Sequence, residues 1–147
     1  MQMVYLEYAE CKMQYDEAIR MFGNLIKDRE RLFTLTQPKS MNYGSEKVIE
    51  SHEKNKLDEY MIALEEVEHK IDVCKRTIED QGMILKIRLN QLIKSDDRLD
   101  LVYYQRKVKH KSISDIINEL GYSRTQLYRY LDKIDAEIEL MRQNGTK

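Results

Sequence analysis

The sequence of 147 residues contains one proline, five glycines, two cysteines and no tryptophan. Because proline and glycine are the residues that most often interrupt a helix, their scarcity leaves room for long helices. The alternation of Val, Ile, Thr and aromatic residues that marks a strand is not sustained anywhere. No apolar run approaches the roughly 20 residues needed to cross a bilayer. We therefore expect an all-α protein, with no sheet and no contact with a membrane, located in the cytoplasm.

The sequence also lacks the residue patterns of enzymes and metal sites. His52, His69 and His110 are scattered, and none has a partner at the spacing of four typical of paired metal ligands. Glycine-rich phosphate loops, Gly-x-Ser-x-Gly and Cys-x-x-Cys are missing. Cys11 and Cys74 fall at apolar positions, where reduced thiols behave as small hydrophobic side chains. We expect no enzymatic activity, no metal and no cofactor.

Two long amphipathic helices are predicted in the first two thirds of the chain. Apolar residues in steps of four and three, from Val4 to Leu32, predict a helix over residues 2–33. A polar segment with Pro38 and Gly44 predicts a loop over residues 34–45. The second helix is expected to start at Ser45 or Glu46 and carries a heptad repeat. The residues of that repeat are Leu57, Leu64, Ile71, Ile78, Leu85 and Leu92.

These patterns predict a long antiparallel helical hairpin or coiled coil over residues 1–93, which we expect to mediate self-association. Gly82 leaves open a kink or a break, because glycine costs about 1 kcal/mol relative to alanine within a helix. The segment from Met83 to Ile93 is apolar over too wide a surface for one partner helix. It is expected to pack on the C-terminal part of the chain or on a second subunit.

Residues 94–147 read as a small bundle that ends in two short helices joined at a glycine. Ser112 and Ser123 are suited to cap the two helices, with Asp115 and Gln126 three positions further on. Gly121 stands where the chain must leave the first helix in a left-handed conformation. The apolar faces of the two helices can pack on each other. This arrangement is typical of a helix-turn-helix.

The outward side of the second short helix is rich in groups that can bind DNA. Arg, Gln and Thr can address base edges, whereas Lys and Arg neutralise phosphate. Residues 104–133 hold seven Lys or Arg against three Asp or Glu, and residues 46–80 hold six against eleven. Such an asymmetry favours a basic DNA-binding head on an acidic assembly segment. The candidate DNA-binding residues are Arg106, Lys109, Lys111, Ser123, Arg124, Thr125, Gln126, Tyr128, Arg129 and Lys133.

The order of the predicted segments along the chain resembles that of phage and prophage late transcriptional regulators of the RinA/ArpU type. The resemblance rests on the loop through Gly44, the long charged helix, and a head similar to region 4 of the sigma-70 family. In the head it is carried by residues 97–104, followed by residues 112–117 and 120–123. It implies an activator of packaging and structural genes, and a contact with host RNA polymerase. It also implies that Arg124, Thr125, Tyr128 and Arg129 lie where recognition-helix residues meet bases.

We therefore expect a sequence-specific regulator that binds double-stranded DNA as a homodimer or higher homo-oligomer. Two alternatives stay open. A subunit like the phage small terminase also joins a helix-turn-helix to a coiled coil, but it forms rings on packaging DNA. A coiled-coil interaction protein that does not bind DNA would use the C-terminal bundle only as a cap.

Overall fold

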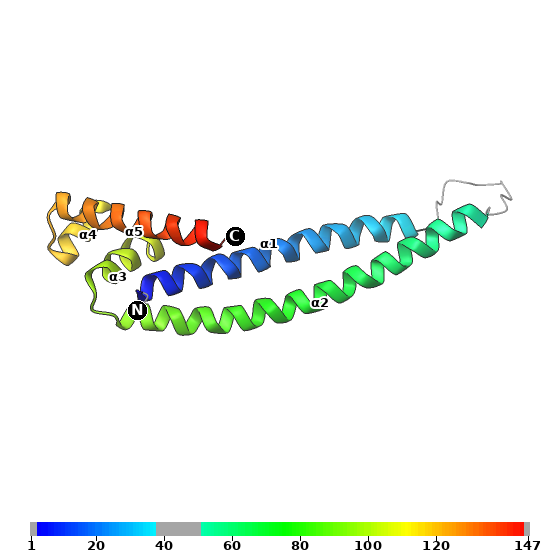
Figure 1. Cartoon of the computed structure of the whole chain (residues 1–147), viewed down its shortest axis with the longest axis horizontal. Helices are drawn as coiled ribbons and strands as arrows, with labels where there is room; N and C mark the ends of the chain where they lie inside the picture. The colour runs from blue at the N-terminus through cyan, green and yellow to red at the C-terminus, as the bar shows by residue number, and fades with distance from the viewer. Residues whose placement is uncertain (1–2, 38–50, 146–147) are drawn as a thin grey trace. The chain divides into compact units, whose positions relative to one another are not determined.

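The computed structural model describes residues 3–37 and 51–145, and every regular element in these ranges is helical (Figure 1). The prediction of an all-α protein is thereby confirmed. The elements, in chain order, are α1 (Val4–Thr36), α2 (Ser51–Lys94), α3 (Arg98–Tyr103), the π-helical segment η1 (Tyr104–Val108), α4 (Ile113–Leu120) and α5 (Arg124–Gly145).

Helix α1 runs three residues beyond its predicted end at residue 33. In the added residues, the side chains of two threonines bond back to carbonyls of the last turn. Thr34 Oγ1 donates to the Glu30 carbonyl at 2.9 Å, and Thr36 Oγ1 donates to the Phe33 carbonyl at 2.8 Å. The remainder of the predicted loop and the predicted start of the second helix lie outside the described residues.

Helix α2 continues through Gly82 without a break. A Cβ atom built on Gly82 would lie 3.5 Å from the Tyr15 ring, an ordinary van der Waals distance. An alanine would therefore also fit at this position, and the glycine does not interrupt the helix.

The chain divides into two compact units. Unit 1 comprises Met1–Asp16 and Asp80–Lys147, and unit 2 comprises Glu17–Glu79. Both units contain a part of α1 and a part of α2. In unit 1 these parts run in opposite directions, because Glu7 pairs with Arg88 at 2.9 Å and Tyr15 lies beside Gly82.

The core of unit 1 collects side chains from α1, α2, α3, α4 and α5. Tyr103 stands near its centre, with ring centroids 5.5 Å from Tyr5 and 6.0 Å from Tyr8. Burial raises the pKa of Tyr103 to about 12, so the phenol is neutral at physiological pH. The buried residues of this core are Tyr5, Tyr8, Ala9, Leu92, Leu99, Val102, Tyr103, Ile116, Leu127, Leu131 and Ile134.

A buried carboxylate ties the first turn of α1 to α3 within unit 1. Asp100 is 2% exposed and accepts hydrogen bonds from the Tyr5 backbone N–H at 2.9 Å and from Ser95 Oγ at 2.5 Å. The free N–H groups at a helix start need acceptors, and Asp100 satisfies one of them. Asp97 caps α3 by accepting from the N–H groups of Leu99 and Asp100. Two acidic residues thus position α3 and the start of α1.

Unit 2 consists of the second part of α1 and the first part of α2. Ala18, Leu32, Ile71 and Cys74 are buried between the two helices. Cys74 Sγ donates to the Ala18 carbonyl at 3.3 Å.

Both cysteines of the chain are free and buried. Burial raises the pKa of the Cys11 thiol, as expected for a reduced thiol in apolar surroundings.

Candidate nucleic-acid interface

Helix α4 begins and ends, and helix α5 begins, at the residues that the local sequence predicts. The Asp115 N–H donates to Ser112 Oγ at 3.2 Å, and the Gln126 N–H donates to Ser123 Oγ at 3.1 Å. Gly121 ends α4 in the left-handed conformation with φ of 74°, and its N–H donates to the Ile117 carbonyl. The connection between the two helices therefore spans only a few residues.

The inner face of α5 is fixed by apolar burial. Leu127 and Ile134 are fully buried, as is Ile116 of α4. Ile113, Ile117 and Leu120 of α4 pack against the same core. Since the buried side chains fix the rotation of α5 about its axis, they also determine which residues face outward.

The outward strip of α5, defined here as Arg124, Thr125, Tyr128, Arg129, Asp132 and Lys133, is exposed along its length. These residues span about 14 Å along the helix axis at a rise of 1.5 Å each, and the DNA major groove, roughly 12 Å wide, admits an α-helix. In the part of the chain that the structure describes, no carboxylate pairs with Arg124, Arg129 or Lys133. Three cations of this strip are therefore available to a ligand.

Gln126, also predicted to face DNA, is half-buried and engaged within the protein. Its amide nitrogen donates to the Tyr130 hydroxyl at 3.0 Å, and Arg98 Nη1 donates to the same hydroxyl at 3.4 Å. The bond from Arg98 lowers the pKa of Tyr130, since it favours the anionic oxygen. The Tyr122 ring packs edge-on against Tyr130 with centroids 5.4 Å apart. This polar cluster supports the start of α5 from the side of α3.

The basic run of residues 106–111 falls partly in the segment η1 and is only partly free. Arg106 Nη1 donates to the Lys111 carbonyl at 2.8 Å, which holds the guanidinium toward the protein. Lys111 Nζ lies 2.7 Å from both carboxylate oxygens of Glu119. Lys107 pairs with Asp135 at 3.0 Å. Internal partners thus occupy three of the cations in this run.

Lys109 differs from its neighbours because its amine lies 5.7 Å above the Tyr104 ring. The ring faces the ammonium without neutralising it, and the Lys109 side chain is exposed. Lys109 is therefore the residue of this run whose charge is best placed to meet a phosphate.

The residues that position the site were missed by sequence reasoning. The pair Asp100 and Tyr5 lies 95 residues apart in the chain, and Arg98 and Tyr130 lie 32 apart. No local pattern links such residues. In the sequence, Asp96 and Asp97 indicate only that a helix begins near them.

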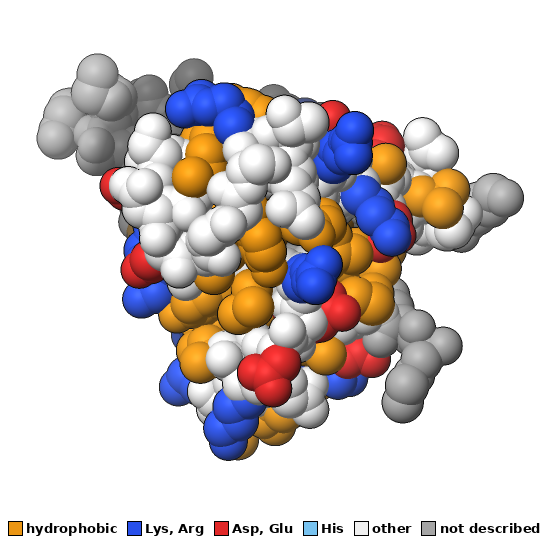
Figure 2. Space-filling view, turned by 90° about the vertical axis from the view of Figure 1, so that its left-hand side faces the viewer, with side chains coloured by type: hydrophobic (Ala, Val, Ile, Leu, Met, Phe, Trp, Pro, Cys, Tyr) orange, Lys and Arg blue, Asp and Glu red, His pale blue; other side chains and the backbone are white. Residues whose placement is uncertain are grey.

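The face that contains the α4–α5 connection carries separate Lys and Arg side chains among hydrophobic and a few acidic ones (Figure 2). The basic groups do not merge into one broad patch in this view. Binding to nucleic acid at this face would therefore depend on individually placed cations more than on a broad positive field.

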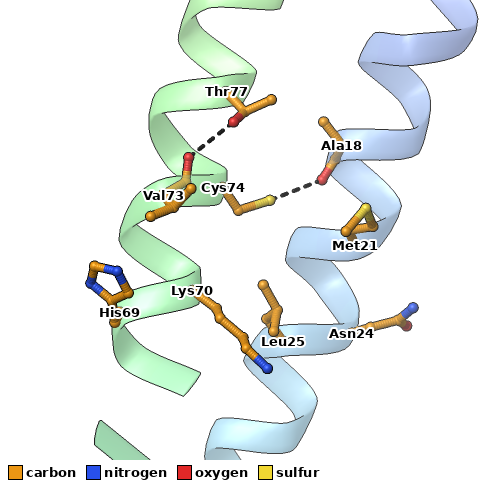
Figure 3. Close-up of a pocket in the computed structure, with 9 residues that line it drawn as sticks. All are labelled: Ala18, Met21, Asn24, Leu25, His69, Lys70, Val73, Cys74 and Thr77. Carbon is orange, nitrogen blue, oxygen red and sulfur yellow. Dashed lines mark hydrogen bonds between the residues drawn. The ribbon is translucent and has the colours of Figure 1, made fainter. Parts of the chain in front are cut away.

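A hollow lies in unit 2, between α1 and α2, with a volume of about 590 Å³ (Figure 3). Met21 and Cys74 contribute sulfur atoms to its wall. The Lys70 side chain extends toward Leu25, whereas His69 points away from α1. The walls are mostly apolar, and the residues that line the hollow include no carboxylate.

Neither a metal site nor a membrane span is found among residues 3–37 and 51–145. No group of three or more His, Cys, Asp or Glu side chains there is arranged to hold a metal ion. None of the helices in this described part combines the length and apolar character that a bilayer span requires.

Comparisons with protein-family models, curated proteins and solved structures find no match to this chain.

Proposed function

We propose that the chain is a sequence-specific DNA-binding transcriptional regulator. In this proposal α4 and α5 form a helix-turn-helix, and the outward strip of α5 enters the major groove. Arg124, Thr125, Tyr128 and Arg129 would meet base edges, while Lys109 and Lys133 would meet phosphates. The observation that carries the proposal is the exposed strip itself, with three cations that have no partner within the described residues.

The caps of α4 and α5 support this assignment of roles. A helix that reads bases must hold its side chains in one geometry. Hydrogen bonds of Gly121 and Ser123 hold the two ends of the connection, and Ser112 caps the other end of α4. Ser123 serves as a cap in the protein, and its hydroxyl could also reach a phosphate at the groove edge. Arg106 and Lys111 are bound within the protein, so we assign them smaller parts in DNA binding.

The first two helices would form an antiparallel hairpin that associates with a second copy. Two heads on a dimer would then read half-sites about 34 Å apart, or a multiple of that distance, on an inverted repeat. The resemblance noted above suggests activation of phage late genes in the bacterial cytoplasm and a contact with RNA polymerase. These two roles rest on that resemblance alone.

Selection from a library of random-sequence duplexes tests the proposal. The full chain should enrich one motif with inverted-repeat symmetry. Lys109→Ala should weaken binding to all duplexes alike and reduce the salt slope by about one unit. Lys75→Ala removes an exposed lysine of unit 2 and serves as the matched control. A library that shows no enrichment, with no duplex bound even at low salt, would contradict the proposal and favour a protein partner.

A further inference from the structure

The stretch of α2 that belongs to unit 1 is apolar on two opposite sides. Leu92 is 1% exposed, and Leu85 and Leu89 pack against the core of unit 1. This burial agrees with the expectation that residues 83–93 pack on the C-terminal part of the chain. It accounts for only one side of the helix.

The other side is open. Met83 is 66% exposed, Ile84 43% and Ile87 57%. At 100° per residue, these three side chains point away from the direction of Leu85, Leu89 and Leu92. We call the open side the outer face of α2, defined by Asp80, Met83, Ile84, Ile87, Asn90, Gln91 and Lys94. Contiguous exposed apolar residues within a polar rim are typical of a protein contact.

We propose that a second copy of this chain binds the outer face of α2 in antiparallel orientation, with the two-fold axis at Ile87. This pairing brings Ile87 beside Ile87 of the second copy. It also places Met83 opposite Gln91 and Ile84 opposite Asn90, so every residue of the outer face meets another residue of the same face. A self-complementary patch of this kind is what a two-fold dimer requires.

Charge favours this occupant and this orientation. The same pairing sets Asp80 of each copy opposite Lys94 of the other, which makes one ion pair at each end of the contact. Both side chains are exposed, and neither has an ion-pair partner among the residues that the structure describes. A parallel pairing would instead set Asp80 beside Asp80 and Lys94 beside Lys94, where like charges repel.

The size of the contact limits its strength. From Asp80 to Lys94 the helix extends about 21 Å at 1.5 Å per residue. A single helix pair of that length buries less than the roughly 1,200–2,000 Å² of a stable interface. The dimer should therefore dissociate on dilution, with a Kd in the micromolar range. The inference deepens the self-association in the proposed function, and its test needs no DNA.

Sedimentation of the full chain over a range of concentrations tests the proposal. The wild type should pass from monomer to dimer, and Ile87→Lys should weaken the dimer about tenfold or more, because it sets two lysines at the axis. Val73→Lys, at a residue 45% exposed in unit 2, is the matched control and should leave the Kd unchanged. Circular dichroism verifies that each variant remains helical.

A charge exchange makes the test specific for the antiparallel orientation. Asp80→Lys and Lys94→Asp should each weaken the dimer severalfold, and the double variant should recover the wild-type Kd because its ion pairs re-form with exchanged signs. A double variant weaker than either single one would overturn the orientation. Loss of the dimer in Val73→Lys but not in Ile87→Lys would overturn the location. Wild-type protein that stays monomeric at hundreds of micromolar would overturn the inference while leaving DNA recognition by α5 untouched.

Discussion

Replacement of Asp100 by alanine should destabilise unit 1 more than any change at its surface. The carboxylate is 2% exposed and accepts from the Tyr5 N–H at 2.9 Å and from Ser95 Oγ at 2.5 Å. Hydrogen bonds to a charged group contribute about 1.5–3 kcal/mol each. Since the variant also leaves the Tyr5 N–H buried without an acceptor, we expect a loss of about 3–5 kcal/mol.

Asp100→Asn removes the negative charge but keeps the shape of the side chain. The asparagine oxygen can still accept from the Tyr5 N–H, and its amide can donate to Ser95 Oγ, so the loss should be about 1–2 kcal/mol. Asp96→Ala is the matched control, because Asp96 is exposed and surface substitutions usually change stability by less than about 0.5 kcal/mol.

Urea unfolding followed by circular dichroism gives the free energies of these variants. Hydrogen–deuterium exchange of a peptide covering residues 3–16 gives a local measure, because Tyr5 lies within it. The expected order of destabilisation is Asp100→Ala, then Asp100→Asn, then Asp96→Ala. If Asp100→Ala proved as stable as Asp96→Ala, with unchanged exchange at residues 3–16, the buried carboxylate would not hold α1 to α3.

Three further outcomes follow from the structure. Gly121→Ala should lower the free energy of unfolding in urea by about 1 kcal/mol, because φ of Gly121 is positive. Gly82→Ala should raise the free energy of unfolding by up to about 1 kcal/mol. Changes of the same sign in both variants would contradict the difference in backbone conformation between the two glycines. The pKa of Tyr103 is raised to about 12, so the neutral phenol contributes its full stability below pH 10, and this contribution is lost as the pH rises toward 12. Between pH 10 and pH 12, Tyr103→Phe should therefore lose less stability than the wild type, as measured by unfolding at alkaline pH. Glu119→Gln should free the Lys111 amine and steepen the salt dependence of DNA binding by about one unit; an unchanged slope would show that Lys111 does not meet DNA.

Local signals predicted the parts of this fold that depend on residues within one helical turn. The helix ends at Ser112, Gly121 and Ser123 could be predicted, because a cap depends only on residues within about three positions of it. The inner face of α5 was predictable for a similar reason, since Leu127, Leu131 and Ile134 repeat at helical spacing.

Contacts between distant segments could not be predicted in this way. Gln126 carries the right chemistry for a base edge, but its amide donates to Tyr130 in the same helix. The distant contact is the one from Arg98 to the Tyr130 hydroxyl, across 32 residues of the chain. Lys111 is a candidate DNA-binding residue by its charge, but its amine lies 2.7 Å from the Glu119 carboxylate. Charge counts along the chain record how many groups are present, and only the fold determines which of them neutralise each other.

The central claim is that the outward strip of α5 reads DNA, and an affinity titration of Arg129→Ala tests it most directly. On the duplex enriched by selection, this variant should lose about 1–3 kcal/mol, or roughly 5- to 150-fold in Kd. Arg76→Ala removes an equal charge from an exposed position of α2 and should bind as the wild type does. If both variants bound that duplex with wild-type affinity, the strip would not be the reading surface.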